Sequence, residues 1–150
     1  MTVKSYSRKW LVAVWCGLAW LGVAEAPALA QISVVMSKSS PAKVTKAEIK
    51  EIFTGAKLKW ANGNKIQVID QPDTALGKEF YAAVVGKSVN QVRAQWTKLL
   101  LSGQAVAPIK YASDKAVKKT VAANPHAIGY IMTGALDDSV QEVLRLELKN

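Results

Sequence analysis

The chain has 150 residues, with 20 Lys and Arg against 11 Asp and Glu, one His and one Cys. Because the one cysteine, Cys16, lies in an N-terminal apolar run, the rest of the chain excludes disulfides, thiol catalysis and thiolate metal sites. The net positive charge attracts anions in general, without choosing among small anions, nucleic acid and an anionic membrane.

The N-terminus has the pattern of a secretory signal peptide. A basic segment precedes an uncharged apolar run over residues 10–23, and a small-x-small cleavage site ends at Ala30. The alternative is an uncleaved membrane anchor, but the run is shorter than the roughly 20 residues needed to span a bilayer. We therefore expect residues 1–30 to be a cleaved signal peptide and residues 31–150 to form one periplasmic domain, without membrane attachment after cleavage.

The charge of this domain is spread over its surface. Three of the 20 basic residues and one of the 11 acidic residues lie in the first thirty positions, which leaves a net charge of about +7. Within residues 31–150 only Arg93 and Arg145 are arginines, whereas surfaces that bind nucleic acid cluster their basic residues and favour Arg. A generally basic soluble surface is the favoured interpretation, and no nucleic-acid partner is expected.

A strand and a capped helix are predicted at the start of the domain. The apolar run over residues 32–36 is typical of a buried strand. Thr45 and Glu48 have the spacing of a capping box, and Gly55 supplies the left-handed position that ends a helix. Trp60 follows as an aromatic anchor.

Two more helices are predicted in the middle of the chain, after a strand over residues 65–69. The first runs from about residue 74 to 85, with Asp73 as its expected cap. The second begins at Ser88, which forms a capping box with Gln91, and ends at Gly103.

The C-terminal part is predicted to contain a helix and two strands. Ser113 caps a helix over residues 114–123, and strands follow over residues 127–132 and 143–149. Because strands alternate with helices, the expected fold class is α/β, with a mostly parallel sheet flanked by helices.

The order of these motifs resembles the phosphate-binding proteins of ABC uptake systems, and most closely the short single-lobe members of this periplasmic phosphate-binding-like family. The resemblance covers nearly all of residues 31–146 and is carried by TKAEIKEIFTG, Trp60, NGNKIQVID, QWTKLLLSG and NPHAIGYI. It implies one lobe of a clamshell that closes on phosphate, and an ABC permease as partner. A single lobe offers only a half-site for the anion.

The loop after the strand over residues 65–69 departs from the family pattern. The resemblance implies an Arg and a Ser-Gly-Thr turn there, but the Arg position corresponds to Gln71 and the turn is absent. Thr74 and Lys78 are the remaining candidates for binding an anion, while Asp73 would repel one. Helix capping by Asp73 and Thr74 is favoured over ligand binding.

A second candidate lies at the end of the first strand. Ser37, Ser39 and Ser40 offer three hydroxyls beside Lys38, at a strand end where ligands of α/β proteins tend to sit. An oxyanion site and an ordinary solvated loop are equally compatible with these residues. The expected anion-binding set is therefore Ser37, Ser39, Ser40, Thr74 and Lys78.

No enzyme, cofactor or metal function is expected. The sequence has no nucleophile elbow, no phosphate-cradling Gly-rich loop, no paired carboxylates with a base and no metal-ligand spacing. His126 stands alone in sequence and is interpreted as a turn residue, and Trp60, Trp96 and Tyr130 as core or edge aromatics.

Two functions remain open. The first is an exported solute-binding-like protein that binds phosphate or another small anion. The second is a non-transport interaction module that has lost the ligand site and docks on an envelope protein or on a second copy of itself, in a homodimer. The family resemblance and the charge favour the first function, and the changed loop favours the second.

Overall fold

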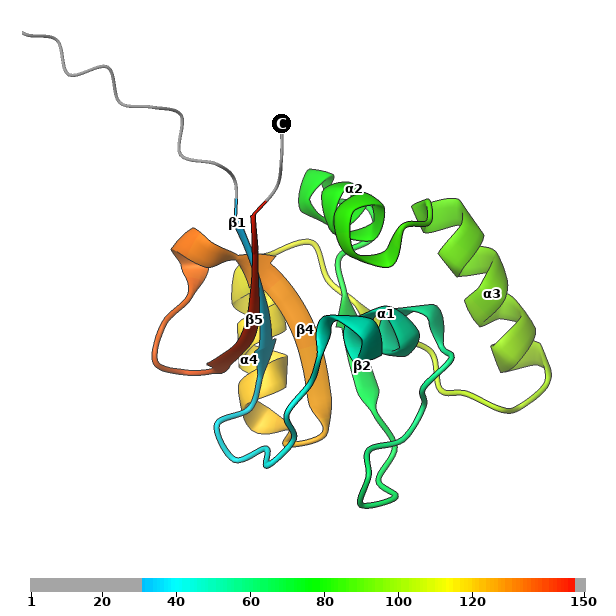
Figure 1. Cartoon of the computed structure of the whole chain (residues 1–150), viewed down its shortest axis with the longest axis horizontal. Coiled ribbons are helices and arrows are strands. Elements are labelled where there is room, and N and C mark those ends of the chain that lie inside the picture. The colour runs from blue at the N-terminus through cyan, green and yellow to red at the C-terminus, as the bar shows by residue number, and fades with distance from the viewer. Residues whose placement is uncertain (1–30, 148–150) are drawn as a thin grey trace, which may run out of the picture.

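The computed structural model describes residues 31–147, so the predicted signal peptide and the last three residues lie outside the described part (Figure 1). The strands are β1 (Gln31–Met36), β2 (Gln67–Asp70), β3 (Ile109–Lys110), β4 (Ala127–Met132) and β5 (Gln141–Glu147). The helices are α1 (Lys46–Thr54), α2 (Ala75–Phe80), the π-helical η1 (Tyr81–Val85), α3 (Val89–Leu101), α4 (Asp114–Ala123) and the 3₁₀-helical η2 (Thr133–Ala135).

The five strands form one mixed sheet in the order β3-β2-β4-β1-β5. β2 pairs in parallel with β3 and β4, whereas β1 pairs antiparallel with both β4 and β5. Four strands therefore run in one direction and β1 runs in the other. The expected α/β class is confirmed, but the sheet is mixed and not mostly parallel, because the reversed β1 lies between β4 and β5 and makes two of the four strand pairs antiparallel.

Helices cover both faces of the sheet. The larger core cluster, on the face covered by α1, η1 and α3, contains Phe53, Phe80 and Trp96 together with β-strand residues such as Ile128. The smaller cluster lies on the other face, where Val117 and Val121 of α4 pack against the sheet. Figure 1 shows α1, α2 and α3 grouped together, away from α4.

The predicted helix caps of α1 and α3 are confirmed. The Thr45 hydroxyl accepts from the N–H of Glu48 at 3.2 Å, and the Glu48 carboxylate accepts from the N–H of Thr45 at 3.0 Å. Gly55 ends α1 with φ 78°, in the left-handed region that glycine adopts at low cost. The Ser88 and Gln91 side chains cap α3 in the same reciprocal way.

The predicted helix over residues 74–85 differs from the observed one in its cap and its second half. Thr74, and not Asp73, caps α2, because its hydroxyl accepts from the N–H of Gly77 at 3.0 Å. Asp73 lies outside the helix and forms an ion pair with Arg93 at 2.9 Å. After Phe80 the helix widens into η1, which ends at Gly86.

The observed bounds of two strands differ from the bounds predicted from the sequence, which were residues 65–69 and 143–149. β2 begins at Gln67 because Lys65 and Ile66 pair with Lys59 and Leu58 in a small turn before the sheet. β5 spans Gln141–Glu147 and shifts its register against β1 between Val34 and Val35.

Trp60 and Trp96 are buried, and each bonds through its indole N–H to a backbone carbonyl that is distant in the sequence. The indole N–H of Trp60 donates to the carbonyl of His126 at 3.1 Å, and that of Trp96 donates to the carbonyl of Phe53 at 2.9 Å. Each bond joins an element to a segment that lies far away in the sequence, so the core interpretation of both side chains is confirmed.

Gly77 allows the loop after β2 to pack directly against α2. A Cβ atom at this position would lie 2.0 Å from the carbonyl oxygen of Gln71 and 3.0 Å from the Cα of Pro72. Both neighbours are backbone atoms, which cannot move aside as the end of a side chain can. The loop therefore holds its position against α2 only if residue 77 has no side chain.

We expect the substitution Gly77→Ala to destabilise the fold by at least about 1 kcal/mol, because overpacking against backbone costs roughly 1–3 kcal/mol. Helix propensity alone predicts the opposite sign, since Ala is favoured over Gly by about 1 kcal/mol in a helix interior. The free energy of unfolding in urea measures the effect. Gly134→Ala is the matched control, because a Cβ there has no neighbour within 4 Å. A Gly77→Ala protein as stable as the wild type would contradict the close packing of the loop.

Candidate functional site

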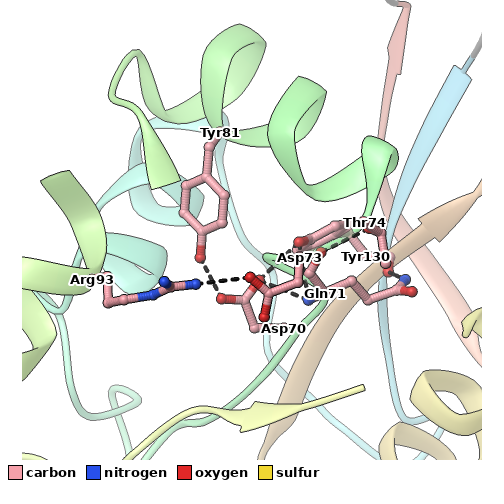
Figure 2. Close-up of polar contacts among 7 residues, drawn as sticks. All are labelled: Asp70, Gln71, Asp73, Thr74, Tyr81, Arg93 and Tyr130. Carbon is pink, nitrogen blue, oxygen red and sulfur yellow. Dashed lines mark hydrogen bonds and ion pairs between the residues drawn. The ribbon is translucent and has the colours of Figure 1, made fainter. Parts of the chain in front are cut away.

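A buried carboxylate lies where the carboxyl end of β2 meets the helices. Asp70 is 5% exposed, and its Oδ2 accepts from the hydroxyl of Tyr81 at 2.7 Å. Its Oδ1 accepts from the hydroxyl of Tyr130 at 2.8 Å and from the N–H of Gln71 at 2.8 Å. Figure 2 shows the two tyrosines reaching this carboxylate from different elements. Asp70 thus joins β2, η1 and β4.

Burial controls the protonation of this group of side chains. It raises the pKa of Asp70 above 3.8, although hydrogen bonds from Tyr81, Tyr130 and the Gln71 N–H act in the opposite direction. Burial, together with the nearby negative charge of Asp70, raises the pKa of both Tyr81 and Tyr130 far above 10.0. The two hydroxyls therefore stay protonated and donate to Asp70.

A cleft opens beside Asp70, against one side of α3. It has a volume of about 160 Å³, and we call it the α3 cleft. Its lining consists of Val89, Val92, Arg93, Trp96, Thr97 and Leu100 of α3, of Asp70, Pro72 and Tyr81, and of Ala107, Pro108 and Lys110 around β3. The cleft lies at the carboxyl ends of the parallel strands β2 and β3, where open α/β sheets usually bind ligands. Apolar side chains form most of its wall.

The α3 cleft contains two cations, Arg93 and Lys110, and one carboxylate, Asp70. Arg93 donates to Asp73 at 2.9 Å, but both side chains are largely exposed, at 48% and 76% (Figure 2). An exposed ion pair of this kind contributes little stability. Arg93 is therefore available to an incoming anion.

Lys78, from the predicted anion-binding set, lies on a shallow hollow next to the α3 cleft. The hollow has a volume of about 370 Å³ and shares Pro72, Val89 and Arg93 with the cleft. Lys78 is exposed, and Asp73 lies on the same hollow. The hollow thus combines two basic side chains with one acidic side chain.

The hydroxyl of Thr74 is used inside the protein. It donates to the carbonyl of Gln71 at 2.7 Å and accepts from the N–H of Gly77. Gln71, at the position where the resemblance implies an Arg, is 2% exposed. Its side-chain amide donates to Asp114 at 2.8 Å and to the carbonyl of Tyr130 at 3.0 Å. The loop after β2 therefore directs its polar groups inward.

The three predicted serines lie at the other end of the sheet. β1 runs antiparallel to β4, so Met36 pairs with Ile128 near the start of β4, whereas Thr74 follows the carboxyl end of β2. The structure therefore does not bring Ser37, Ser39 and Ser40 together with Thr74 and Lys78.

Internal hydrogen bonds hold the serine loop as well. The hydroxyl of Ser37 bonds to that of Ser39 at 2.9 Å, and the hydroxyl of Ser40 accepts from the N–H of Ala42 at 3.4 Å. The side-chain amide of Gln141 donates to the carbonyls of Ser37 and Ser40 at 2.8 and 3.0 Å. Ser37 and Ser40 are buried, and Ser39 is exposed.

Sequence reasoning missed four residues of the site: Asp70, Tyr81, Arg93 and Lys110. The one available signal was an acidic residue placed directly after the apolar strand segment VI, where a buried carboxylate needs donors. Nothing in the sequence pairs Asp70 with tyrosines 11 and 60 positions away. Within residues 31–147, no group of three His, Cys, Asp or Glu side chains is placed to hold a metal ion.

Comparison with known proteins gives similarity at the level of structure. No protein-family model and no curated protein sequence matches the chain. A putative phosphate ABC transporter substrate-binding protein with bound phosphate from Clostridium perfringens is 25% identical, with a TM-score of 0.59 over 77% of this chain and 45% of that chain. An ABC-type phosphate transport receptor from Vibrio cholerae is 21% identical, with a TM-score of 0.58 over 77% of this chain and 46% of that chain.

A third solved structure agrees with these two. PstS from Borrelia burgdorferi is 18% identical, with a TM-score of 0.54 over 70% of this chain and 42% of that chain. This chain spans less than half the length of each of the three proteins. The resemblance predicted from the sequence is confirmed at the level of the fold: the chain is similar to just under half of each of these phosphate-binding proteins.

Proposed function

We propose that this chain is an exported solute-binding-like protein that captures a small anion in the α3 cleft. The observation that carries the proposal is the pair of cations, Arg93 and Lys110, on an apolar cleft at the carboxyl ends of β2 and β3. A mostly apolar pocket with a few convergent polar groups and a carboxyl of perturbed pKa is the usual form of a small-molecule site. The fold shared with solute-binding proteins supports the same function.

The proposed anion site differs from the one that the family resemblance implies. Gln71 and Thr74 use their polar side chains in internal hydrogen bonds, so the loop after β2 offers an anion few free side-chain donors. Asp73 adds a negative charge at the start of α2. Tight phosphate binding at this loop is therefore not expected, and Arg93 and Lys110 become the principal anion ligands.

Export is part of the proposal and rests on the sequence of residues 1–30. Within residues 31–147, no helix is long and apolar enough to cross a bilayer. We expect the protein to reach the periplasm and to be cleaved after Ala30. N-terminal sequencing of the protein recovered from the periplasm should give Gln31 as the first residue. A protein that stays in the membrane fraction and begins at Met1 would contradict cleavage.

A second function, docking on an envelope protein such as an ABC permease or on a second copy of the chain, is favoured by exposed apolar residues. Leu101 is 85% exposed, Val106 is 56% exposed and Ile109 is 38% exposed. They lie at the end of α3, in the following loop and on β3, the short edge strand of the sheet. Exposed apolar side chains next to a sheet edge are typical of a protein-interaction surface.

Mapping by NMR tests where small anions bind. The ¹H–¹⁵N spectrum of the protein is recorded during titration with phosphate, sulfate and acetate at millimolar concentrations. We expect saturable shifts concentrated in residues 89–100 and 107–110, and saturation at higher anion concentration in the Arg93→Gln and Lys110→Gln variants. Removing a charge-assisted hydrogen bond should weaken binding about tenfold.

The control variants for this titration are Ser39→Ala and Lys78→Gln, which should bind as the wild type does. Anion-induced shifts that are weakened by Lys78→Gln and not by Arg93→Gln would place the anion at the start of α2. Shifts lost only in Ser39→Ala would place it at the serine loop. A spectrum that none of the three anions changes would contradict anion capture and favour the docking function.

A further inference from the structure

We infer that the α3 cleft binds a monocarboxylate with an apolar body the size of a six-membered ring. This inference rests on the function proposed above and names the ligand class of the same site. It follows from the size of the cleft, from its apolar wall and from the small number of free donors that line it.

The volume and the wall of the cleft define the body of the ligand. About 160 Å³ is close to the volume of an engineered apolar cavity of about 150 Å³ that binds benzene. Val92, Trp96 and Leu100 form an apolar wall along α3. The indole N–H of Trp96 already donates to the carbonyl of Phe53, so a ligand meets the ring and not a free donor. A ring packed against an aromatic side chain gains both buried area and favourable stacking geometry.

The donors that line the cleft define the head group. Thr97 donates its hydroxyl to the carbonyl of Arg93 at 2.9 Å, and Tyr81 donates its hydroxyl to Asp70. Among the side chains that line the cleft, this leaves Arg93 and Lys110 as donors to a ligand. The guanidinium of Arg93 has five N–H groups, one of which bonds to Asp73.

Two cationic donors match the two oxygens of a carboxylate. Arg in particular binds carboxylates through paired, nearly parallel hydrogen bonds. Phosphate would instead place unpaired oxygens against Val92 and Leu100, and unpaired polar groups buried on an apolar wall are costly. A dianion would also meet the carboxylate of Asp70 with twice the charge of a monocarboxylate.

Whether the cleft prefers an anionic or a cationic ligand depends on how many acceptor sites of the Asp70 carboxylate already hold a hydrogen bond. Its two oxygens accept three hydrogen bonds, from Tyr81, Tyr130 and the N–H of Gln71. An ammonium group would find only one remaining lone pair, on Oδ2 of Asp70, and it would lie beside the positive charges of Arg93 and Lys110, which attract a carboxylate instead. The cleft therefore favours an anion over a cation of the same shape.

Isothermal titration with four probes tests the ligand class: benzoate, acetate, benzyl alcohol and benzylamine. We expect benzoate to bind at least about tenfold more tightly than acetate, which lacks the ring, and than benzyl alcohol, which lacks the charge. Benzylamine should bind more weakly than benzoate.

Matched variants of α3 separate the contributions of the wall and the charge. Leu100→Gln should remove most of the preference for benzoate over acetate, whereas Leu101→Gln should not, because Leu101 is 85% exposed and does not line the cleft. Arg93→Gln should weaken benzoate binding about tenfold, and Lys98→Gln, on the same helix but outside the cleft, should leave it unchanged.

The outcomes distinguish this inference from the function on which it rests. Equal affinities for benzoate and acetate, both dependent on Arg93, would overturn the ligand class and leave anion capture intact. Tighter binding of benzylamine would show that Asp70 sets the charge of the ligand and would also overturn the class. Absence of binding by benzoate and by every anion of the NMR titration would overturn both proposals.

Discussion

The buried carboxylate of Asp70 is the interaction on which the rest of this structure depends. A carboxylate that is 5% exposed is costly unless donors surround it, and here the donors come from η1, from β4 and from the backbone that follows β2. The aromatic rings of both tyrosines extend the arrangement into the core, where Phe80 packs against Tyr81 and stacks on Tyr130 at a centroid distance of 3.9 Å. Satisfying one acidic group thus fixes the carboxyl end of the sheet against the helices.

The same arrangement decides what the loop after β2 can bind. With its N–H donating to Asp70 and its side chain donating to Asp114 and the Tyr130 carbonyl, Gln71 is turned into the protein. Thr74 and Gly77 then hold the loop against α2. The polar groups that the family resemblance would direct toward phosphate serve the fold here, and the cations Arg93 and Lys110 lie beside the loop, on the α3 cleft.

The sequence predicts the helix caps of this protein well, because they depend on residues that are close to one another in the sequence. Both capping boxes join residues three positions apart, and Gly55 ends α1 by its own backbone preference. Asp73 was wrongly predicted as a cap because its partner, Arg93, lies 20 positions away on another helix. Either side chain of the Asp73-Thr74 pair satisfies the capping rule, and only the three-dimensional position of α3 decides between them.

The candidate site was harder to predict because it depends on contacts between distant segments. The alternation of strands and helices along the chain predicts an α/β sheet, but it does not predict that β1 runs in the reverse direction. This direction places the serine loop at the opposite end of the sheet from Thr74. The partners of Asp70 lie 11 and 60 positions away, and Lys110 lies on a strand of two residues. The resemblance to a family predicted the fold, but it did not predict that Arg93 and Lys110 line one cleft, because these residues meet only in the folded chain.

The stability of the wild type relative to Asp70→Asn, measured from pH 3 to pH 8, tests the role of this buried carboxylate most directly. Because burial raises the pKa of Asp70 in the folded state, the folded protein keeps a proton that the unfolded chain releases above about pH 3.8. The free energy of unfolding of the wild type should therefore fall relative to the variant as pH rises above 3.8, and level off above the folded-state pKa. Glu48, Asp137 and Glu142, whose pKa values are lowered by hydrogen bonds from Lys57, Lys118 and Arg145, act in the opposite direction but equally in both proteins. A difference that stays constant or rises with pH would contradict a carboxylate whose burial outweighs its three donors.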